Sequence, residues 1–414
     1  MKKNRFNKDF LLVVIGQIIS ILGSAMLRFA LNLYVLDITG RADIFAIVIA
    51  VSTIPGIIFS PIGGAVADRF NRRNLMVIFD FSSSAVVLIL ILLMSASAIP
   101  ISIIVVILTI LAVISFMYHP AVQASVPTLV SEEQLAGANG IVNGVGSLAG
   151  LLGPVLGGIL YGIIGLKTLV IMSCIAFSLS AIMEMFIKIP FTKRISGKHI
   201  VSTIFDDIKD GFTYIGKSNP VLLKIIFLAS LINMILTPLF IIGLPYVLRV
   251  VMKSSDMMYG VGLGILELSA ITGALSTGIL AKRLKISNVY ISFLIISILL
   301  LPMALSVTSF FLGFGYWIPF ILFFSITFIV VFLMTAVSVF IVTDVQKITP
   351  NEMLGKIMAI MMAASHVAAP LGQILYGYLF QALHNTVYVP VLTASVFTAV
   401  IALIAKRALR EKKA

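Results

Sequence analysis

One carboxylate, Glu267, lies near the middle of a long apolar segment of the chain. Burial in a lipid-like environment disfavours the charged form of a carboxylate, so such a group can bind and release a proton in the range that a proton-coupled carrier needs. Glu267 is therefore the candidate for proton coupling. A structural role stays open, because the same side chain could pair with a basic residue or hydrogen-bond a neighbouring helix.

A stripe of polar side chains follows the first apolar segment at helical spacing, formed by Gln17, Ser20, Ser24 and Arg28, with Asn32 near its edge. A guanidinium group inside a membrane is costly unless it faces water or an anionic partner. We expect Arg28 to point into a central cavity, where it would meet an anionic group or a carboxylate. The alternative is that its long side chain reaches back to the outer surface.

Four further polar residues within or beside apolar segments are candidates for lining the cavity: His119, Gln123, Asn233 and His366. For the two histidines a packing role with one hydrogen bond stays open. The chain has no His-Glu-x-x-His motif, no Gly-x-Ser-x-Gly motif and no pair of membrane aspartates, which argues against an intramembrane enzyme.

The composition places most of the chain in lipid, since 60% of its 414 residues are hydrophobic, 11% are charged and the mean hydropathy is +1.16. Twelve apolar segments reach the roughly 20 residues that a membrane span needs. They must be helices, because lipid offers no partner for exposed backbone groups. The sequence predicts an N-terminal six-helix bundle at 1–188, a cytoplasmic linker with an amphipathic helix at 189–219, and a C-terminal six-helix bundle at 220–414.

The net charge of +13 comes from basic residues gathered in the gaps between apolar segments, which is not the footprint of a nucleic-acid-binding surface. Most of the 29 Lys and Arg residues fall in alternate gaps and at the two ends of the chain. The positive-inside rule places these parts in the cytoplasm. We therefore expect a multi-pass protein of a bacterial-type plasma membrane with both termini cytoplasmic. The single cysteine, Cys174, can form no intrachain disulfide.

The chain carries two internal echoes at nearly the same offset. The basic hairpin Gly64–Arg73 has a fainter copy at Gly278–Lys285, and Leu156–Gly162 resembles Leu371–Gly377. Two echoes at one offset indicate a duplication, and parallel repeats of six spans are typical of transporters. The predicted fold class is an all-α membrane protein with twelve transmembrane helices in two pseudo-symmetric six-helix halves.

The basic hairpin resembles the signature G-x-x-x-D-R-x-G-R-R of the major facilitator superfamily, carried by Gly64, Asp68, Arg69, Arg72 and Arg73. Asn71 stands in place of the signature's second glycine, and asparagine also tolerates positive φ. The fifth span resembles the antiporter motif G-x8-G-x3-G-P-x2-G-G, carried by Gly140, Gly153, Pro154, Gly157 and Gly158, with Ala149 at its second glycine. This resemblance covers essentially the whole chain and implies the major facilitator fold.

In that superfamily the hairpin is an ionic latch that holds the outward-open state, and the motif of span five accompanies export in exchange for protons. The segments 120–123, 127–130 and 135–139 look like the branch of drug:proton antiporters that contains macrolide and siderophore exporters. The resemblance also implies that spans one, four, seven and ten line the cavity. A purely topological hairpin and ordinary tight packing of span five stay open as alternatives.

Two acidic residues near the inner ends of spans are expected to have structural roles. Lys188 follows Glu184 by four residues, which predicts an i,i+4 ion pair on one helix. Asp80 is expected to join the ionic cluster of the basic hairpin.

The resemblance implies a secondary active transporter that exports an amphipathic small molecule, such as a macrolide-like drug or a siderophore, by alternating access coupled to protons. The alternative is a lipid (lysophospholipid) flippase or a carrier without proton coupling. The expected partners are a small-molecule substrate and membrane lipids, with no nucleic acid, no nucleotide and no cofactor beyond a proton gradient, and the protein is expected to be a monomer. The segment 211–218 matches the phosphate-loop pattern G-x4-G-K-S, but the linker has no room for the α/β domain that such a loop needs.

Overall fold

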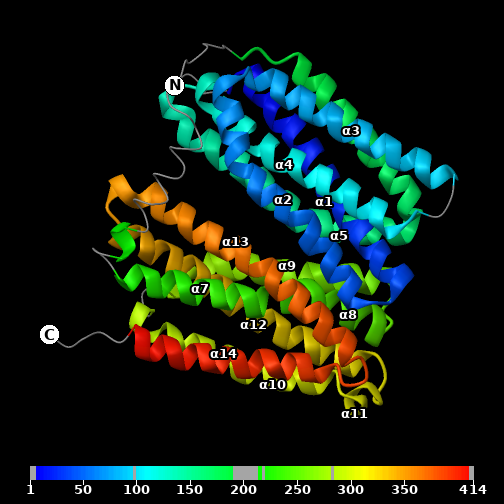
Figure 1. Cartoon of the computed structure of the whole chain (residues 1–414), viewed down its shortest axis with the longest axis vertical. Coiled ribbons are helices and arrows are strands. Elements are labelled where there is room, and N and C mark those ends of the chain that lie inside the picture. Colours follow the sequence, from blue (N-terminus) through cyan, green and yellow to red (C-terminus); the bar gives the residue numbers. More distant parts are fainter. Residues whose placement is uncertain (1–5, 97–98, 190–212, 217–219, 281–283, 410–414) are drawn as a thin grey trace. The chain divides into compact units, whose positions relative to one another are not determined.

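The computed structural model describes residues 6–96, 99–189, 213–216, 220–280 and 284–409 (Figure 1). Within these ranges the chain is helical and contains no strand. Its first part forms α1 (Lys8–Thr39), α2 (Ala42–Arg69), α3 (Arg72–Ala96), α4 (Ile101–Leu129) and α5 (Glu132–Met185). Most of the amphipathic helix expected in the linker lies outside the described residues.

The later part of the chain forms long helices of similar kind: α7 (Pro220–Pro238), α9 (Asp256–Leu280), α10 (Val289–Ser306), α12 (Trp317–Ile348), α13 (Asn351–Ala382) and α14 (Tyr388–Ala408). After α7 the seventh span continues through two π-helical turns, Leu239–Gly243 and Val247–Val251, on either side of the short α8 (Leu244–Tyr246). Another short helix, α11 (Ser309–Leu312), lies between α10 and α12.

The described helices give the twelve membrane spans that the sequence predicts. Ten helices among the described residues are long and apolar enough to cross a membrane by length and composition, and one of these ten, α5, supplies two spans. The 54-residue α5 would be about 80 Å long if it were straight, more than twice a bilayer core of roughly 30 Å. Its backbone leaves the helical region at Gly165 (φ 74°, ψ 167°), so α5 forms spans five and six. The second span is the 28-residue α2.

The chain forms two compact units. The N-terminal unit comprises Met1–Ile38, Val51–Gly197 and Asp256–Gly260, and the C-terminal unit comprises Thr39–Ala50, Lys198–Ser255 and Val261–Ala414. Within the N-terminal unit α3 packs along α5 and α4, and within the C-terminal unit α10 packs along α14 and α12 (Figure 1). These pairings are equivalent in the two halves, because they join span three to span six and span nine to span twelve.

The echo between spans five and eleven is visible in their closest contacts. A Cβ atom added to Gly157 would lie 3.0 Å from the backbone carbonyl oxygen of Met26 on the first span. The same addition at Gly372 would collide with the carbonyl oxygen of Met234 on the seventh span. Both glycines let a helix backbone approach a neighbour closely, which is how membrane helices associate without a hydrophobic driving force.

A second pair of glycines repeats the arrangement one and a half turns later. Gly162 lies against Asp256, which begins α9, and Gly377 lies against the backbone of Ala42, which begins α2. The amide of Ala42 also donates to Oε1 of Gln381 at 3.2 Å. These contacts explain why the first turn of α9 belongs to the N-terminal unit and the first turns of α2 to the C-terminal unit.

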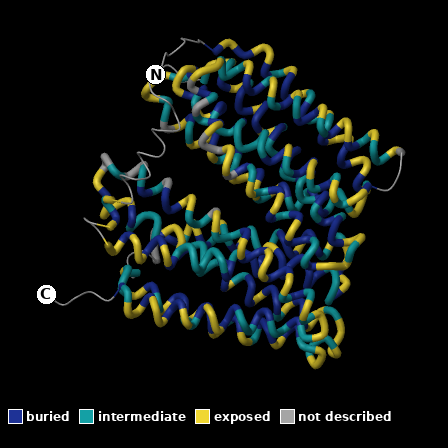
Figure 2. Tube along the Cα trace, viewed as in Figure 1, coloured by how far each residue is buried: buried dark blue, intermediate teal, exposed yellow. Residues whose placement is uncertain are grey.

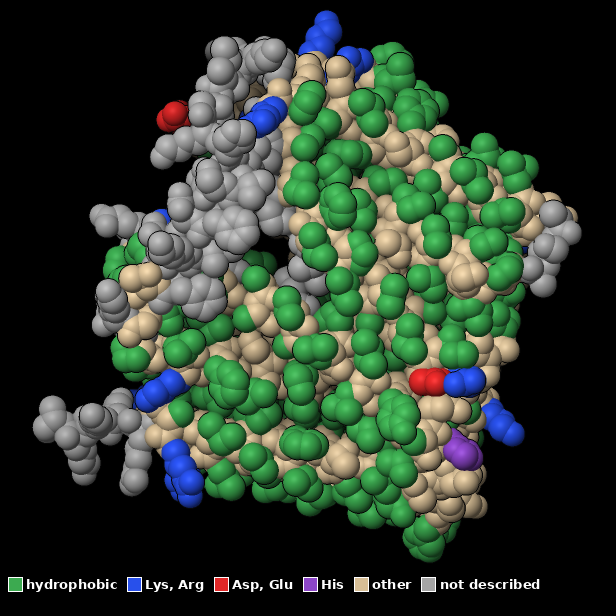
Figure 3. All heavy atoms as spheres, in the orientation of Figure 1, with side chains coloured by type: hydrophobic (Ala, Val, Ile, Leu, Met, Phe, Trp, Pro, Cys, Tyr) green, Lys and Arg blue, Asp and Glu red, His purple; other side chains and the backbone are tan. Residues whose placement is uncertain are grey.

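The helices expose many large apolar side chains along their length. Leu92 and Ile298 are each 63% exposed. Exposed and buried residues recur along every long helix in Figure 2, and hydrophobic side chains cover most of the face seen in Figure 3. An apolar outer surface of this kind is suited to lipid.

Candidate functional site

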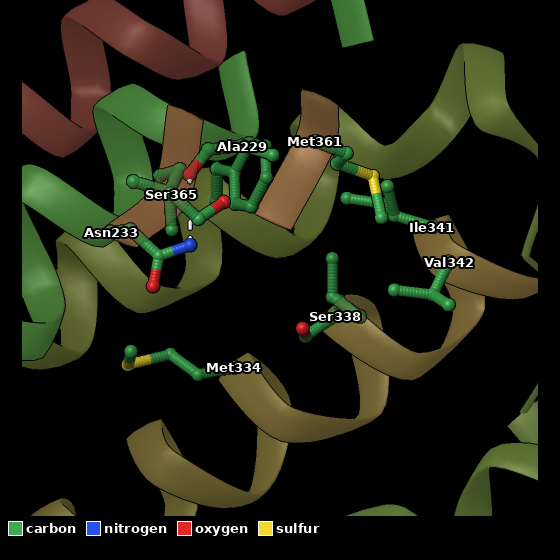
Figure 4. A pocket seen from close by; sticks show the side chains of 11 residues that line it. Ala229, Asn233, Met334, Ser338, Ile341, Val342, Met361 and Ser365 are labelled. Carbon is green, nitrogen blue, oxygen red and sulfur yellow. Dashed lines mark hydrogen bonds between the residues drawn. The ribbon is translucent and has the colours of Figure 1, made fainter. Parts of the chain in front are cut away.

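The C-terminal unit contains a pocket between α7, α10, α12 and α13 (Figure 4). Its wall combines aliphatic, aromatic, thioether and hydroxyl side chains: Ala229, Ile232, Asn233, Phe293, Met334, Val337, Ser338, Ile341, Val342, Met361 and Ser365. The carboxamide of Asn233 is held along its own helix. Its Nδ2 donates to the carbonyl oxygen of Ala229 at 3.1 Å, and its Oδ1 accepts from Oγ1 of Thr237 at 3.1 Å.

This wall is suited to one part of an amphipathic molecule. Met334 and Met361 offer flexible, polarisable side chains that adapt to different shapes. Ser338 and Ser365 offer hydroxyls that both donate and accept hydrogen bonds. The cavity volume of about 80 Å³ is well below the roughly 300 Å³ of small ligand pockets, so the pocket takes one group of a larger molecule.

The N-terminal unit has a polar hollow of its own, here called the N-terminal hollow. Its lining side chains come from α1, α4 and α5: Ile21, Ser115, Tyr118, His119, Asn143, Gly146 and Ser147. Nε2 of the exposed Gln123 donates to Oδ1 of Asn143 at 3.3 Å. Of the predicted cavity residues, the structure thus brings His119 and Gln123 together around Asn143.

Behind this hollow lie two carboxyl groups that are almost completely buried. The side chain of Glu184 on α5 has no exposed surface, and Asp80 on α3 is 2% exposed. The hydroxyl of Tyr118 donates to Oε1 of Glu184 at 2.6 Å, and the hydroxyl of Ser20 donates to Oδ1 of Asp80 at 2.6 Å. The second carboxyl oxygen of each residue, Oε2 and Oδ2, is buried and has no hydrogen-bond partner among the described residues. These four residues form the carboxyl cluster.

The structural roles that the sequence predicts for these two acids are wrong. Lys188 is exposed and forms no ion pair with Glu184, because Glu184 turns inward to Tyr118. Asp80 points to Ser20 and makes no ion pair with the arginines of the basic hairpin. Elsewhere in the described ranges Nη2 of Arg41 lies 2.6 Å from Oδ2 of Asp43, and the hydrogen bond that Arg41 donates to this carboxylate raises the pKa of Arg41.

The basic hairpin is bonded to the C-terminal end of α5. Nη2 of Arg73 donates to the carbonyl oxygen of Met185, and Nε of Arg72 donates to the carbonyl oxygen of Ala67 at 3.3 Å. Arg69 is exposed, and Gly64 has open space where a Cβ atom would lie. The side chain of Asp68 is outside the described part of the structure, so the ionic latch stays a prediction.

Asn71 does not use the positive φ that its place in the signature suggested. Its Oδ1 accepts from the backbone N–H of Arg73 at 3.1 Å and of Asn74 at 3.4 Å. These are the second and third residues of α3, so Asn71 is the N-cap of that helix. Among the described residues other than glycine, only Lys253 has a positive φ.

The antiporter-like motif faces α1. A Cβ atom on Gly153 would collide with Ala25, and Gly158 packs against the ring of Phe29. That ring lies 5.8 Å from the ring of Tyr259, measured between centroids. Gly140 has open space where a Cβ atom would lie, and the helix continues through Pro154. The later motif residues therefore make close contacts, whereas Gly140 does not.

The other described candidates lie on α1 and on α9. Gln17 is fully buried and its Nε2 donates to the carbonyl oxygen of Val142 at 3.2 Å, so it joins α1 to α5. Ser24 is buried, whereas Arg28 and Asn32 are partly buried along the same helix. Glu267 is partly buried on α9. The side chain of His366 is outside the described part of the structure.

Some functional candidates were missed, and part of the signal was present in the sequence. Met334 and Ser338 on α12, and Met361 and Ser365 on α13, each recur at i,i+4 and so share a helix face. The carboxyl cluster left no such pattern, because its hydrogen bonds join residues 60 and 66 positions apart.

Comparisons with known proteins agree with this architecture. The family model described as Major Facilitator Superfamily matches residues 13–372. Macrolide efflux protein A of Streptococcus pyogenes is 27% identical over 139 residues, which is 34% of this chain and 34% of that protein. The matched part thus spans about a third of the length of this curated relative, and a second protein of that name from the serotype M6 strain matches equally.

Several solved structures share the fold at low sequence identity. The nucleoside transporter NupG has a TM-score of 0.72 at 13% identity, over 98% of this chain and 100% of that one. A bacterial homologue of the iron transporter ferroportin has a TM-score of 0.70 at 14% identity, over 96% and 98% of the two chains. A bacterial homologue of the human lysosomal transporter Spinster has a TM-score of 0.69 at 12% identity, over 98% of each. The chain belongs to the major facilitator superfamily, whose family model covers most of its length.

Proposed function

We propose that this protein exports an amphipathic small molecule, of the macrolide-like or siderophore class, in exchange for protons. The observation that carries the proposal is the similarity to macrolide efflux protein A. The mixed wall of Met and Ser side chains in the C-terminal unit supports it, because such a wall can accept apolar and polar parts of one molecule. In this proposal the protein is a transporter without a catalytic step, and its partners are the substrate and the lipid bilayer.

Glu267 is proposed as a proton-coupling residue, because a carboxylate in an apolar span needs a compensating proton or partner. The basic hairpin of Gly64, Asp68, Arg69, Arg72 and Arg73 is proposed as the conformational latch of the family. The polar stripe of α1, with Arg28 at its centre, is proposed to contact the substrate.

The proposal is tested by substrate efflux measured in everted membrane vesicles. A panel of macrolides, siderophores and dyes is presented with and without a pH gradient, and accumulation in the vesicles is followed. The proposal expects accumulation that requires the gradient and decreases in Glu267→Gln. Transport of the panel that ignores the gradient would favour a carrier without proton coupling, and movement of lysophospholipid alone would favour a flippase.

The pocket is tested in the same assay with two methionine variants. Met334→Ala removes a side chain from the pocket wall and should raise the KM of the substrate about tenfold, the usual effect of a lost apolar contact. Met257→Ala is the matched control, because this methionine is 74% exposed on α9. Equal KM values for the two variants would remove the pocket from the substrate path.

A further inference from the structure

We propose that Asp80 and Glu184 form a proton-binding site inside the N-terminal unit, separate from Glu267 and reached from the N-terminal hollow through Tyr118. This inference deepens the proposed function, on which its role in transport rests. It assigns to the exporter a second place where a transported proton can be held.

The first argument is the burial of charge. Glu184 and Asp80 lie among α1, α3, α4 and α5, with 0% and 2% of their surface exposed. They face neighbouring turns of α1, because Cγ of Glu184 lies 3.4 Å from the place of a Cβ atom on Gly16 and Asp80 accepts from the hydroxyl of Ser20. An isolated carboxylate is very costly in such an environment, and two neighbouring carboxylates cannot both stay ionised. At least one of Asp80 and Glu184 must therefore be neutral.

The second argument is that no cation reaches the two acids from the described residues of the neighbouring elements. Arg73 on α3 is directed to the carbonyl oxygen of Met185, and the exposed Lys188 follows α5, where its backbone N–H donates to Asp9 of α1 at 3.1 Å. The groups that α1 contributes here are uncharged. The hydroxyl of Ser20 donates to Asp80, and the carbonyl oxygen of Gly16 accepts from the hydroxyl of Ser180. The nearby titratable groups of α4 are Tyr118 and His119, and His119 lines the hollow. No ion pair reaches either acid among the described residues.

A bound proton satisfies this site better than a metal ion. A hard cation takes six or more oxygen ligands converging on one point. In the described ranges no group of three or more His, Cys, Asp or Glu residues is placed to hold a metal. Oδ2 of Asp80 and Oε2 of Glu184 have no hydrogen-bond partner among the described residues, so a proton bound there removes the buried charge without displacing an existing hydrogen bond.

Tyr118 provides the connection to water. Its side chain lines the N-terminal hollow, while its hydroxyl donates to Oε1 of Glu184. A phenol both donates and accepts, so it can exchange a proton with Glu184 on one side and with water on the other. In the binding step, a hydronium ion in the hollow gives H⁺ to the phenol oxygen of Tyr118 and becomes water, while the former Tyr118 O–H proton passes to Oε1 of the Glu184 carboxylate. Release reverses the step, and no electron changes place.

The binding site is tested by infrared difference spectroscopy of the purified, full-length protein across a pH titration, without substrate. The C=O stretch of a buried protonated carboxyl group should be present in the wild-type protein and lost in the double variant Asp80→Asn/Glu184→Gln. The exposed Glu133→Gln is the matched control and should leave the band unchanged. Tyr118→Phe should shift the band, because it removes the hydrogen bond but neither acid. A band that is unchanged in the double variant and in Tyr118→Phe would overturn the site, as would its replacement by a sodium-dependent signal.

Thermal unfolding of each variant shows whether it folds, and the isosteric Glu184→Gln serves if the double variant does not. Transport separates this inference from the proposed function. If wild-type vesicles export with a pH gradient and Glu184→Gln does so with the same proton dependence, the inference fails and the function stands. If the wild-type protein shows no gradient-dependent export but the infrared band depends on Glu184, the function fails and the proton site stands.

Discussion

Short hydrogen bonds between single side chains connect the helices of the N-terminal unit. The hydroxyl of Ser84 on α3 lies 2.7 Å from that of Ser178 and 3.3 Å from the carbonyl oxygen of Cys174, both on α5. Interhelical hydrogen bonds in membranes contribute about 0.6 kcal/mol on average, so such contacts select the register of two helices more than they stabilise the pair. Tighter constraints come from residues that cap a helix or contact a backbone directly.

Asn71 is such a residue. We expect Asn71→Ala to lower the free energy of unfolding by about 1 kcal/mol, because it removes the side-chain acceptor for two N–H groups at the start of α3. Asn71→Gly restores the family signature and should cost only a few tenths of a kcal/mol. Thermal unfolding of the purified variants measures the difference. Equal losses would show that the cap does not stabilise α3.

The sequence predicts single charged residues inside apolar segments better than it predicts clusters that tertiary packing assembles. Glu267 and Arg28 are noticeable because a charge interrupts an apolar segment. The carboxyl cluster could not be predicted, because local spacing favoured Lys188 as the partner of Glu184 and only tertiary packing brings Tyr118 to it. A tertiary hydrogen bond to a buried group outweighs an i,i+4 pair of about 0.3–0.5 kcal/mol.

Helices in this chain meet through glycines at specific positions. Span five approaches span one at Gly157, and span eleven approaches span seven at Gly372. Both glycines belong to the internal repeat of Leu156–Gly162 and Leu371–Gly377, so the repeat in the sequence indicates where a helix contacts a neighbouring backbone. The π-helical turns of span seven were not predictable, since Pro238 and Pro245 indicate an interruption but not the wider hydrogen-bonding pattern that replaces the α-helix.

A glycine series tests these contacts. Gly372→Ala should destabilise the protein by about 1–3 kcal/mol, because its Cβ would collide with the carbonyl oxygen of Met234 and backbone must move. Gly150→Ala should be neutral or stabilising by up to about 1 kcal/mol, because nothing lies within 4 Å of the added atom and alanine favours a helix. Unfolding temperatures in one detergent give the comparison. A loss at Gly150 equal to that at Gly372 would contradict the contact argument.

The molecule as a whole combines two units of equivalent build with an asymmetric hairpin. Asp68 in the first hairpin corresponds to Lys282 in its copy, so the full signature occurs once. Composition, span number and duplication were all predictable, because they depend on hydropathy and repeats that extend over many residues. The substrate and the details of the pocket were not, because they depend on a few side chains from distant helices.

The asymmetry leads to a kinetic prediction for the transporter. Asp68→Asn should reduce the turnover of transport more than the ground-state affinity for substrate, because a latch acts on the exchange between conformations. Lys282→Gln, at the equivalent place in the second hairpin, should leave the ratio of turnover to substrate affinity near that of the wild type. Counterflow rates and equilibrium substrate binding supply the two measurements. A loss of affinity with unchanged turnover in Asp68→Asn would contradict the latch.

Orientation in the membrane follows from the charge distribution and can be measured directly. In a Cys174→Ala background, we expect an impermeant maleimide to label Lys167→Cys in intact cells, because this residue is exposed and the positive-inside rule predicts that it faces outward. Arg69→Cys, exposed in the basic hairpin, should react only after the cells are permeabilised. The reverse pattern would show that the termini face outward.

The break in α5 bears on how the chain enters the bilayer during synthesis. Spans five and six are separated by one non-helical residue, Gly165, so neither has a tether long enough to insert while the other waits in water. We expect the two to leave the translocation machinery together as a helical hairpin and, in the orientation that the positive-inside rule predicts, to carry Lys167 across at its tip. Glu184 lies at the C-terminal end of span six, so in that orientation the carboxyl group that becomes buried does not have to cross the membrane.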